Sequence, residues 1–347
     1  LVGLPATSGG VLLTGGSMAN LTAVVTARHE RLGEERLSMG TIYVSDQMHH
    51  SVHKAAVIAG VRARHVRLVP TDSEYRLRTD ALVEMIRADR GDGLVPFCIV
   101  ANAGTTNTGA VDDLREVAAI AKAHGAWFHV DACYGGFFLL TERGRNTLAG
   151  IELCDSVALD PHKSLFLPFG TGCLLVRDLS SLRRAHAVHS DYVATLEEHS
   201  ERINFADLSA EQSREARGLR VWLPVKLIGA DAFRRALDEK LDLANLAAEG
   251  IRSIDGLELL AAPQLSILAF RAVRPGMTEH ELDDVNRSLL EIANRAGPAH
   301  LSPTVLNGRF ALRICALSFR THREMIESCI RCLRSSGLLT LCARLRR

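Results

Sequence analysis

The first half of the chain alternates short β-rich runs with helical patterns, and this alternation restricts the fold more than any other feature. The β-rich runs are Gly10–Thr14, Thr41–Ser45, His65–Val69, Phe97–Ala101, Trp127–Val130, Ser156–Leu159 and Cys173–Val176. Helical spacing between several of them occurs at Met18–Leu32, Ser51–Ala59, Thr79–Arg90 and Asp113–His124. Strands that alternate with helices predict an α/β fold with a mostly parallel central sheet covered on both faces. Ligands of such sheets bind beyond the carboxyl ends of the strands, so we expect the chemistry there.

The pattern changes after Arg177. The stretch 190–217 is polar and charge-rich with weak periodicity, which is typical of a mobile catalytic loop in a compact enzyme. The segments expected after it are helices at Leu219–Leu227 and Asp231–Ser253, then β–β–α–β–β–α at Leu257–Leu260, Leu265–Arg271, Glu279–Arg295, His300–Leu306, Phe310–Ala316 and His322–Ser336. We therefore predict a large domain at 1–189, the loop region at 190–217, connecting helices at 218–255 and a small C-terminal α+β domain at 256–347.

The composition is that of a soluble globular protein. The 347 residues are 47% hydrophobic and 23% charged, which is enough for a large domain and a smaller one. A formal net charge of +1 gives no indication of nucleic acid or an anionic membrane as a partner. No apolar run approaches the roughly 20 residues that span a bilayer, and we expect no secretory signal because no basic stretch followed by an apolar run occurs at Leu1. Because Leu1 lies close to a predicted strand, we expect that an N-terminal segment is missing.

The eight cysteines lie mostly in apolar, strand-like stretches. This placement predicts buried, reduced thiols and a cytoplasmic location. Cys329 and Cys332 form one C-x-x-C pair, but the pair lies in a helical pattern and has no second pair to complete a zinc site. We therefore expect no metal.

Two charged side chains follow apolar strands. Lys163 comes just after the predicted strand that ends at Leu159, and Asp131 ends the strand that begins at Trp127. A lysine becomes nucleophilic when desolvation or nearby positive charge disfavours its ammonium form, as in a cofactor pocket. A carboxylate at a strand end could pair with the protonated nitrogen of a pyridine ring. Taken singly, a surface lysine is the more common interpretation of Lys163, and an N-cap aspartate is as common an interpretation of Asp131 as a cofactor partner.

A glycine-rich turn and a histidine occupy two further strand ends. Gly16 and Ser17 join the first predicted strand to a helix, where backbone N–H groups could bind a phosphate. His49 follows the strand that ends at Ser45 and could stack on a flat heterocycle. Most such turns bind nothing, and a solvent-exposed or core histidine is the more common alternative. The order of the four features along the chain, each at a β-to-loop junction, is more informative than any one of them.

With these motifs in this order, the chain resembles the group II decarboxylases that use pyridoxal 5′-phosphate (PLP), the family of aromatic-L-amino-acid and glutamate decarboxylases. The resemblance runs from about Gly9 to Gly337 and so covers nearly all of the chain. It implies the fold of the PLP-dependent transferases, aspartate aminotransferase-like fold type I, with PLP as cofactor. It also implies a homodimer with active sites near the interface.

The resemblance assigns roles to the strand-end residues. Lys163 matches the lysine that holds PLP as a Schiff base, and His162 is its usual neighbour. Asp131 matches the partner of the pyridine nitrogen. His49, in the motif D-Q-x-H-x-S, matches the residue stacked on the cofactor ring.

Further positions match cofactor contacts of the family. Gly16 and Ser17 correspond to the phosphate-binding pair. Thr106 and Asp112 lie in a segment that the family places near the cofactor. Cys133 stands where a small alanine is common, and we expect it to pack against the other face of the ring.

Some positions depart from the family pattern or align loosely. Tyr192 falls in the polar segment where the family has a catalytic loop tyrosine, against the alternative of a plain surface tyrosine. Asp160 stands where the family often has asparagine, Ser164 replaces a bulky aromatic residue, and Met18 replaces an acidic or polar one. None of these changes removes a catalytic group.

The activity that the resemblance implies is α-decarboxylation of an L-amino acid to the amine and carbon dioxide. Tyr192 is the expected donor of the proton that returns to Cα. Aromatic amino acids are the first expectation for the substrate, with acidic and diamino acids open. A PLP aldehyde synthase, lyase or aminotransferase of the same fold is an alternative, since fold does not fix function. A non-catalytic remnant that binds PLP or a partner chain without turnover is another.

Overall fold

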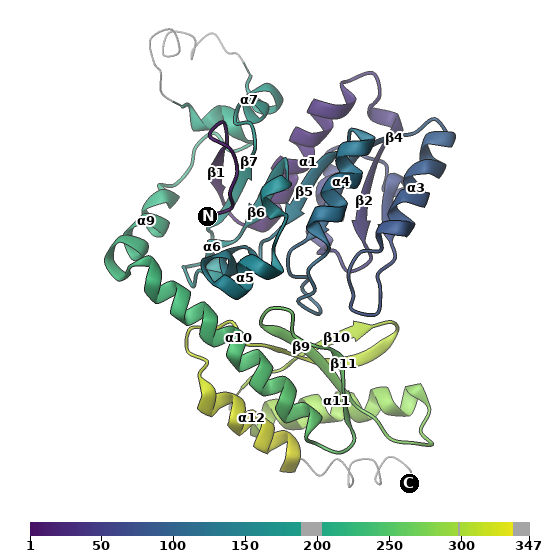
Figure 1. Cartoon of the computed structure of the whole chain (residues 1–347), viewed down its shortest axis with the longest axis vertical. Helices are drawn as coiled ribbons and strands as arrows, with labels where there is room; N and C mark the ends of the chain where they lie inside the picture. Colours follow the sequence, from purple (N-terminus) through teal and green to yellow (C-terminus); the bar gives the residue numbers. More distant parts are fainter. Residues whose placement is uncertain (189–202, 298, 336–347) are drawn as a thin grey trace.

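The computed structural model describes residues 1–188, 203–297 and 299–335 of the chain. Two β-sheets organise this part of the molecule. Figure 1 shows the larger sheet with its helices in the upper part and the smaller sheet below it, with the long helix α10 (Ala230–Arg252) running alongside the lower part.

The large sheet has seven strands in the order β1-β7-β6-β5-β4-β2-β3. Their bounds are β1 Gly9–Leu13, β2 Gly40–Ser45, β3 Val66–Val69, β4 Val95–Asn102, β5 Trp127–Asp131, β6 Ser156–Leu159 and β7 Gly172–Val176. The pairs from β3 through β6 are parallel, and β7 is antiparallel to both of its neighbours. The predicted mostly parallel sheet is confirmed, and each strand lies within a few residues of its predicted position.

Helices cover both faces of this sheet. The principal ones are α1 Gly16–Leu32, α2 His50–Ile58, α3 Thr79–Gly91 and α4 Leu114–His124. On β2, Ile42 and Val44 pack with residues of α1 and α2. The intervening Tyr43 packs with residues of α3 and α4. This alternation is what a strand buried on both faces requires, because successive side chains point to opposite sides.

The four main helices lie where the sequence predicts them, whereas three short ones were not predicted. The short helices are α5 Glu142–Thr147, α6 Pro161–Ser164 and α7 Ser180–His186. Local signals account for the ends of α4: the Asp113 carboxylate accepts a hydrogen bond from the Glu116 N–H at 3.0 Å, and Gly125 ends the helix in the left-handed conformation.

The second half of the chain forms the smaller unit. Its helices and strands are α9 Arg217–Ile228, α10, β8 Leu257–Ala261, β9 Ile267–Ala272, α11 Glu279–Ala296, β10 Ser302–Leu306, β11 Arg309–Cys315 and α12 Arg323–Ser335. The antiparallel sheet runs β10-β11-β9-β8. One of its faces packs on α10, α11 and α12 through Leu268, Phe270 and Leu312. The predicted β–β–α–β–β–α order is confirmed.

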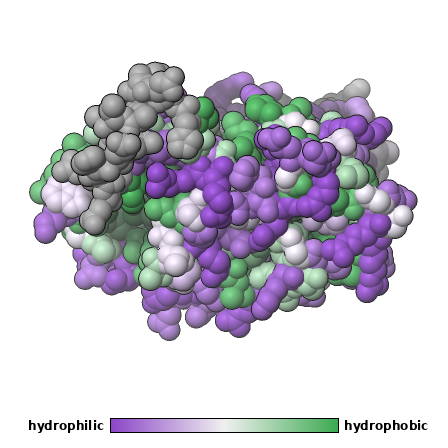
Figure 2. Space-filling model, turned by 90° about the horizontal axis from the view of Figure 1, so that it is seen from above, coloured by the Kyte–Doolittle hydropathy of each residue, from purple (hydrophilic) through white to green (hydrophobic). Residues whose placement is uncertain are grey.

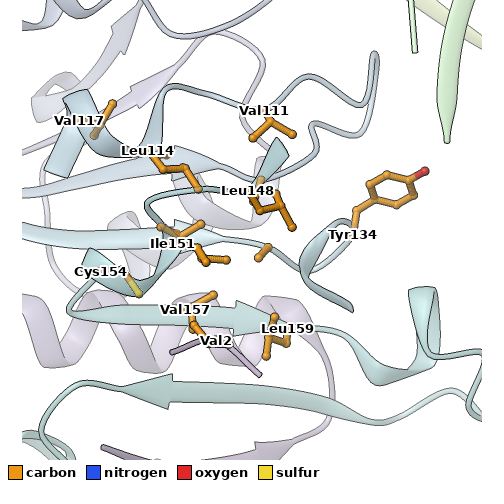
Figure 3. Close-up of a cluster of buried hydrophobic side chains, with 14 of the residues drawn as sticks. Val2, Val111, Leu114, Val117, Tyr134, Leu148, Ile151, Cys154, Val157 and Leu159 are labelled. Atoms are coloured by element: carbon orange, nitrogen blue, oxygen red, sulfur yellow. The ribbon is translucent and has the colours of Figure 1, made fainter. Parts of the chain in front are cut away.

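A shared core and polar contacts join the two units beside the carboxyl ends of the large sheet. Figure 3 shows the core of the larger unit, where Val157 and Leu159 of β6 lie near Val2 and Ile151. Leu265 and Ile267 of the smaller unit belong to the same cluster. The Tyr134 hydroxyl lies 2.5 Å from the Ser266 hydroxyl, and Arg313 of β11 donates to the Thr106 carbonyl. The smaller unit therefore supports loops that follow β4 and β5.

The surface in Figure 2 is mostly hydrophilic, with hydrophobic residues in small groups. Among the helices in the described ranges, none combines the length and apolarity needed to cross a membrane.

Candidate active site

A cavity of about 360 Å³ opens at the carboxyl edge of the large sheet. Loops after β1, β2, β4, β5 and β6 converge on it because these strands are mutually parallel and end at the same edge. The lining residues are Thr14, Gly15, Gly16, Ser17, Met18, Asn20, His49, Ser51, Asn102, Gly104, Thr105, Thr106, Asp131, Cys133, Tyr134, Asp160, His162 and Lys163. Of the residues predicted from the sequence, all line the cavity except Asp112, which lies behind it, and Tyr192, which lies outside the described residues.

The glycine turn after β1 starts helix α1 directly at Gly16. A Cβ atom at Gly16 would lie 2.4 Å from the Cys133 sulfur and 2.8 Å from Asp160 Oδ2, so no larger residue fits there. In the described structure no side chain caps this helix. Its first backbone N–H groups therefore face the cavity as a ready site for an anion.

Asp131 ends β5 as a buried carboxylate, 7% exposed. It accepts hydrogen bonds from Asn20 Nδ2 at 2.9 Å and from the Cys133 N–H at 3.2 Å. Burial raises the pKa of this carboxyl, but the hydrogen bonds from Cys133 and Asn20 and the positive charge of Lys163 outweigh it, so the pKa is lowered overall. Asp131 is therefore an anion at neutral pH, aimed into the cavity.

Behind Asp131 lies a buried polar chain that the sequence did not reveal. His129 Nε2 lies 3.0 Å from Asn20 Oδ1, and His129 Nδ1 lies 2.8 Å from the Ser156 hydroxyl. Since the amide oxygen can only accept, Nε2 must carry the proton. Ser156 accepts from Trp127 Nε1 at 2.7 Å and is left to donate to Nδ1. The network fixes both the His129 tautomer and the orientation of Asn20, whose amide group then points at Asp131.

His129 makes the stability of the protein depend on pH. Burial lowers its pKa to about 4, below the value of about 6.5 for an unfolded chain. The unfolded state therefore binds the extra proton first, and stability is lost as the pH falls from about 6.5 toward 4. Between pH 7 and pH 5 this single group should lower the free energy of unfolding by about 2 kcal/mol.

Comparing His129→Gln with the original chain measures this contribution. Urea unfolding at pH 7 and pH 5 should show a smaller loss of stability in the variant, since glutamine does not titrate. Burial raises the pKa of Asp112 to about 6, which has the opposite effect on stability. That effect is common to both proteins and cancels in the comparison. An equal pH dependence in both would contradict a neutral, buried His129.

The Asn20 amide also orients His49 through Ser51. Asn20 Nδ2 donates to the Ser51 hydroxyl at 3.1 Å, and that hydroxyl lies 2.7 Å from His49 Nδ1. Ser51 N–H points at the same ring nitrogen at 3.3 Å, so Nδ1 is the acceptor. Burial lowers the pKa of His49. A neutral His49 therefore carries its proton on Nε2.

Lys163 lies on the single turn α6, which follows β6. Its ammonium nitrogen lies 3.1 Å from Asp160 Oδ2. Burial lowers its pKa, but the interactions with Cys133, Asp160 and Asp131 together outweigh burial and raise the pKa overall. The adjacent His162 donates from Nδ1 to the Thr171 carbonyl at 2.7 Å, which holds its ring against the cavity.

Thr106 and Asp112 lie at different depths. Thr106 lines the cavity, and Arg313 holds its carbonyl group. Asp112 accepts from the N–H groups of Asn102 and Leu77, each at 2.7 Å. Asn102 in turn lines the cavity, whereas Asp112 contacts Asn102 from behind it.

The chain matches known proteins over most of its length. A family model described as the pyridoxal-dependent decarboxylase conserved domain matches residues 1–273. An aromatic-L-amino-acid decarboxylase of Bacillus atrophaeus is 36% identical over 93% of this chain and 68% of its own length. An L-2,4-diaminobutyrate decarboxylase of Rhizobium meliloti is 32% identical over 94% of this chain and 66% of its own length.

A solved structure agrees with this grouping. The crystal structure of TDC from Oryza sativa with PLP and tryptamine superposes with a TM-score of 0.87 at 29% identity, covering 100% of this chain and 74% of that one. The chain thus spans about two thirds of the curated relatives that it matches. The expected fold type I architecture is confirmed. The chain belongs to the pyridoxal-dependent decarboxylase family, whose cofactor is pyridoxal 5′-phosphate.

Proposed function

We propose that the protein removes the carboxylate of an L-amino acid as carbon dioxide, with PLP held at Lys163. The observation that carries the proposal is the convergence of Lys163, Asp131, His49 and the Gly16 turn on one cavity. These residues come from separate segments of the chain. They supply an amine, an anion, a flat ring and an anion-binding helix end.

The side chains present fit this cofactor. The missing Cβ at Gly16 lets Cys133 and Asp160 pack closely against the turn, and the uncapped helix start offers backbone N–H groups to a phosphate. Asp131 is a buried anion suited to a protonated ring nitrogen. When bound, PLP supplies an electron sink for the electrons of the broken Cα–carboxylate bond.

The remaining roles belong to the chain itself. Lys163 would hold the cofactor through Nζ and release it to the substrate amine. Asp131 would keep the proton on the ring nitrogen, and the Asn20 amide would keep Asp131 in place. His49 would cover one ring face and offer its Nε2 proton to the cavity. Tyr192 stays a prediction from the sequence as the donor to Cα.

An aromatic amino acid is the substrate that we propose first. The aromatic-L-amino-acid decarboxylase of B. atrophaeus supports this choice, whereas the R. meliloti relative keeps diamino acids open. The test is a panel of aromatic, acidic and diamino L-amino acids, assayed for carbon dioxide and amine. We expect carbon dioxide and amine in equal amounts, with aromatic substrates fastest. Amine transfer without carbon dioxide, or an aldehyde product, would favour another enzyme of the same fold. Cofactor binding with no turnover on any substrate would favour a non-catalytic remnant.

We also propose that two copies associate, and that the exposed side of α9 contributes to their contact. This helix exposes apolar side chains, namely Leu219 62%, Trp222 58%, Leu223 47%, Leu227 75% and Ile228 61%. Such a surface is costly in a monomer and marks an interaction site. A self-complementary apolar surface suits a two-fold dimer because the same patch meets itself.

The double variant Trp222→Asp and Leu227→Asp should shift the protein from dimer toward monomer in light scattering after size-exclusion chromatography. Leu68→Asp is the control, because Leu68 is also an exposed apolar residue, 53% exposed, and lies on β3 at the far edge of the sheet. A variant mass that matches that of the original chain would exclude α9 from the contact.

A further inference from the structure

Asp160 is a second buried carboxylate in the cavity, 2% exposed. Its Oδ2 lies 3.1 Å from Lys163 Nζ and 3.7 Å from His162 Nε2. Its Oδ1 has no hydrogen-bond partner within the described residues. None of the roles proposed for Lys163, Asp131 and His49 uses this carboxylate.

The local fold brings the two charges together. Asp160 directly follows the buried strand β6, and Pro161 begins the single turn of α6. In such a turn the side chains at positions i and i+3 lie on the same side, so Lys163 returns over Asp160. A buried carboxylate is costly unless a cation is paired with it. Within the described residues, Lys163 provides the closest such cation.

The other titratable groups around the pair do not replace this interaction. Burial raises the pKa of Cys133 and of Cys173, so both are neutral thiols near pH 7. Burial lowers the pKa of His49, which is therefore neutral as well. Asp131 is an anion whose field also favours a charged Lys163. No salt bridge joins Asp131 to Lys163 in the described structure, whereas Asp160 lies within contact distance.

We propose that Asp160 holds Lys163 as an ammonium ion in the ligand-free cavity and so sets the pH above which this amine can react. An ammonium nitrogen has no free electron pair, so Nζ must first lose a proton to solvent. Nζ can then attack an aldehyde carbon, and a C=N bond forms as the carbonyl oxygen leaves as water with the two remaining amine protons. The protonation of Lys163 concerns the ligand-free protein, and only its consequence for PLP attachment rests on the proposed function.

Competitive labelling measures the protonation of Lys163 without any cofactor. The ligand-free full chain is treated with a trace of acetic anhydride at a series of pH values, and the peptide containing Lys163 is quantified by mass spectrometry. The exposed Lys54 in the same digest is the reference amine. We expect Lys163 to become reactive only at a higher pH than Lys54.

Asp160→Asn keeps the shape of the side chain and removes its charge. Its Lys163 labelling midpoint should fall by about one pH unit or more, since an opposite charge at this distance shifts a pKa by about 1 to 3 units. At pH 8 this amounts to roughly tenfold faster labelling or more. Asp155→Asn is the matched control, because Asp155 precedes the same strand at its opposite end. The pH midpoint of Lys163 labelling in Asp155→Asn should equal that of the original chain.

The outcomes separate the inference about Asp160 from the proposed function. Equal midpoints for Asp160→Asn and the original chain overturn the inference, as does a Lys163 midpoint at or below that of Lys54 in the original chain. The second comparison needs no variant and holds even if Asp160→Asn does not fold. Adding PLP at pH 7.5 and following its visible band should show faster loading in Asp160→Asn. If Asp160→Asn shows the labelling shift but neither this variant nor the original chain gains the visible band of bound PLP, the inference stands and the proposed function fails.

Discussion

Lys163→Ala is expected to abolish covalent attachment of PLP and to lower carbon dioxide release on the order of 10³-fold or more. Lys163 is the lysine that lines the cavity, where it faces Asp131 and the Gly16 turn. Alanine leaves no amine to bind the cofactor covalently or to release it to the substrate. The measurements are absorbance of the PLP-treated protein after gel filtration and carbon dioxide release from the preferred amino acid.

Lys122→Ala is the control for loss of a lysine elsewhere. Lys122 is exposed on α4 and does not line this cavity. The Lys122→Ala variant should retain both the absorption band of bound PLP and the release of carbon dioxide. A Lys163→Ala protein that still forms the covalent band would show that another amine holds the cofactor.

Asp131→Asn is expected to lower turnover by roughly 10²- to 10³-fold while the fold is kept, the range seen when one electrostatic contact to the reacting groups is removed. Asparagine preserves the shape and can still accept the Asn20 hydrogen bond, but it carries no charge to hold a proton on the ring nitrogen. The measurement is kcat with saturating PLP, together with circular dichroism to confirm folding.

The same substitution separates two roles of Asp131. If the carboxylate only anchored the cofactor, excess PLP would restore turnover. We expect no such rescue, because the missing charge affects the reaction itself. Asp155→Asn, a carboxylate at the opposite end of the neighbouring strand β6, should keep normal activity. Near-normal kcat in Asp131→Asn would contradict the pairing with the ring nitrogen.

The strands and the main helices could be predicted because their signals are local. The run Trp127–Val130 is mostly apolar, begins two residues after Gly125 and is followed by Asp131, so its approximate length and its end follow from the sequence. Short helices such as α6 lack periodicity and depend on tertiary contacts. They were not predictable in this way.

The order of the strand-end motifs, together with the family resemblance, predicted residues that line the cavity. The polar network behind them could not be predicted. From the sequence alone, Asn20 is an ordinary residue of a predicted helix, and His129 is a histidine within a predicted buried strand. Two polar residues on otherwise buried faces were the available signal. Only the folded arrangement brings the Asn20 amide to Asp131, 111 positions along the chain.

The position of Asp112 shows the limit of carrying over a segment as a whole. The resemblance placed it near the cofactor with Thr106, and both lie in the same stretch after β4. The backbone returns from Thr106, so that Asp112 pairs with Asn102 from behind the cavity. A sequence match to the segment does not distinguish contact from support.

Borohydride reduction of the PLP-loaded protein, followed by peptide mapping, shows which residue holds the cofactor. Reduction fixes the cofactor on whichever amine holds it, and mass spectrometry identifies the residue. We expect a single phosphopyridoxyl group on Lys163. Its appearance on another lysine, or its absence from a protein that retains PLP, would contradict the assignment of Lys163.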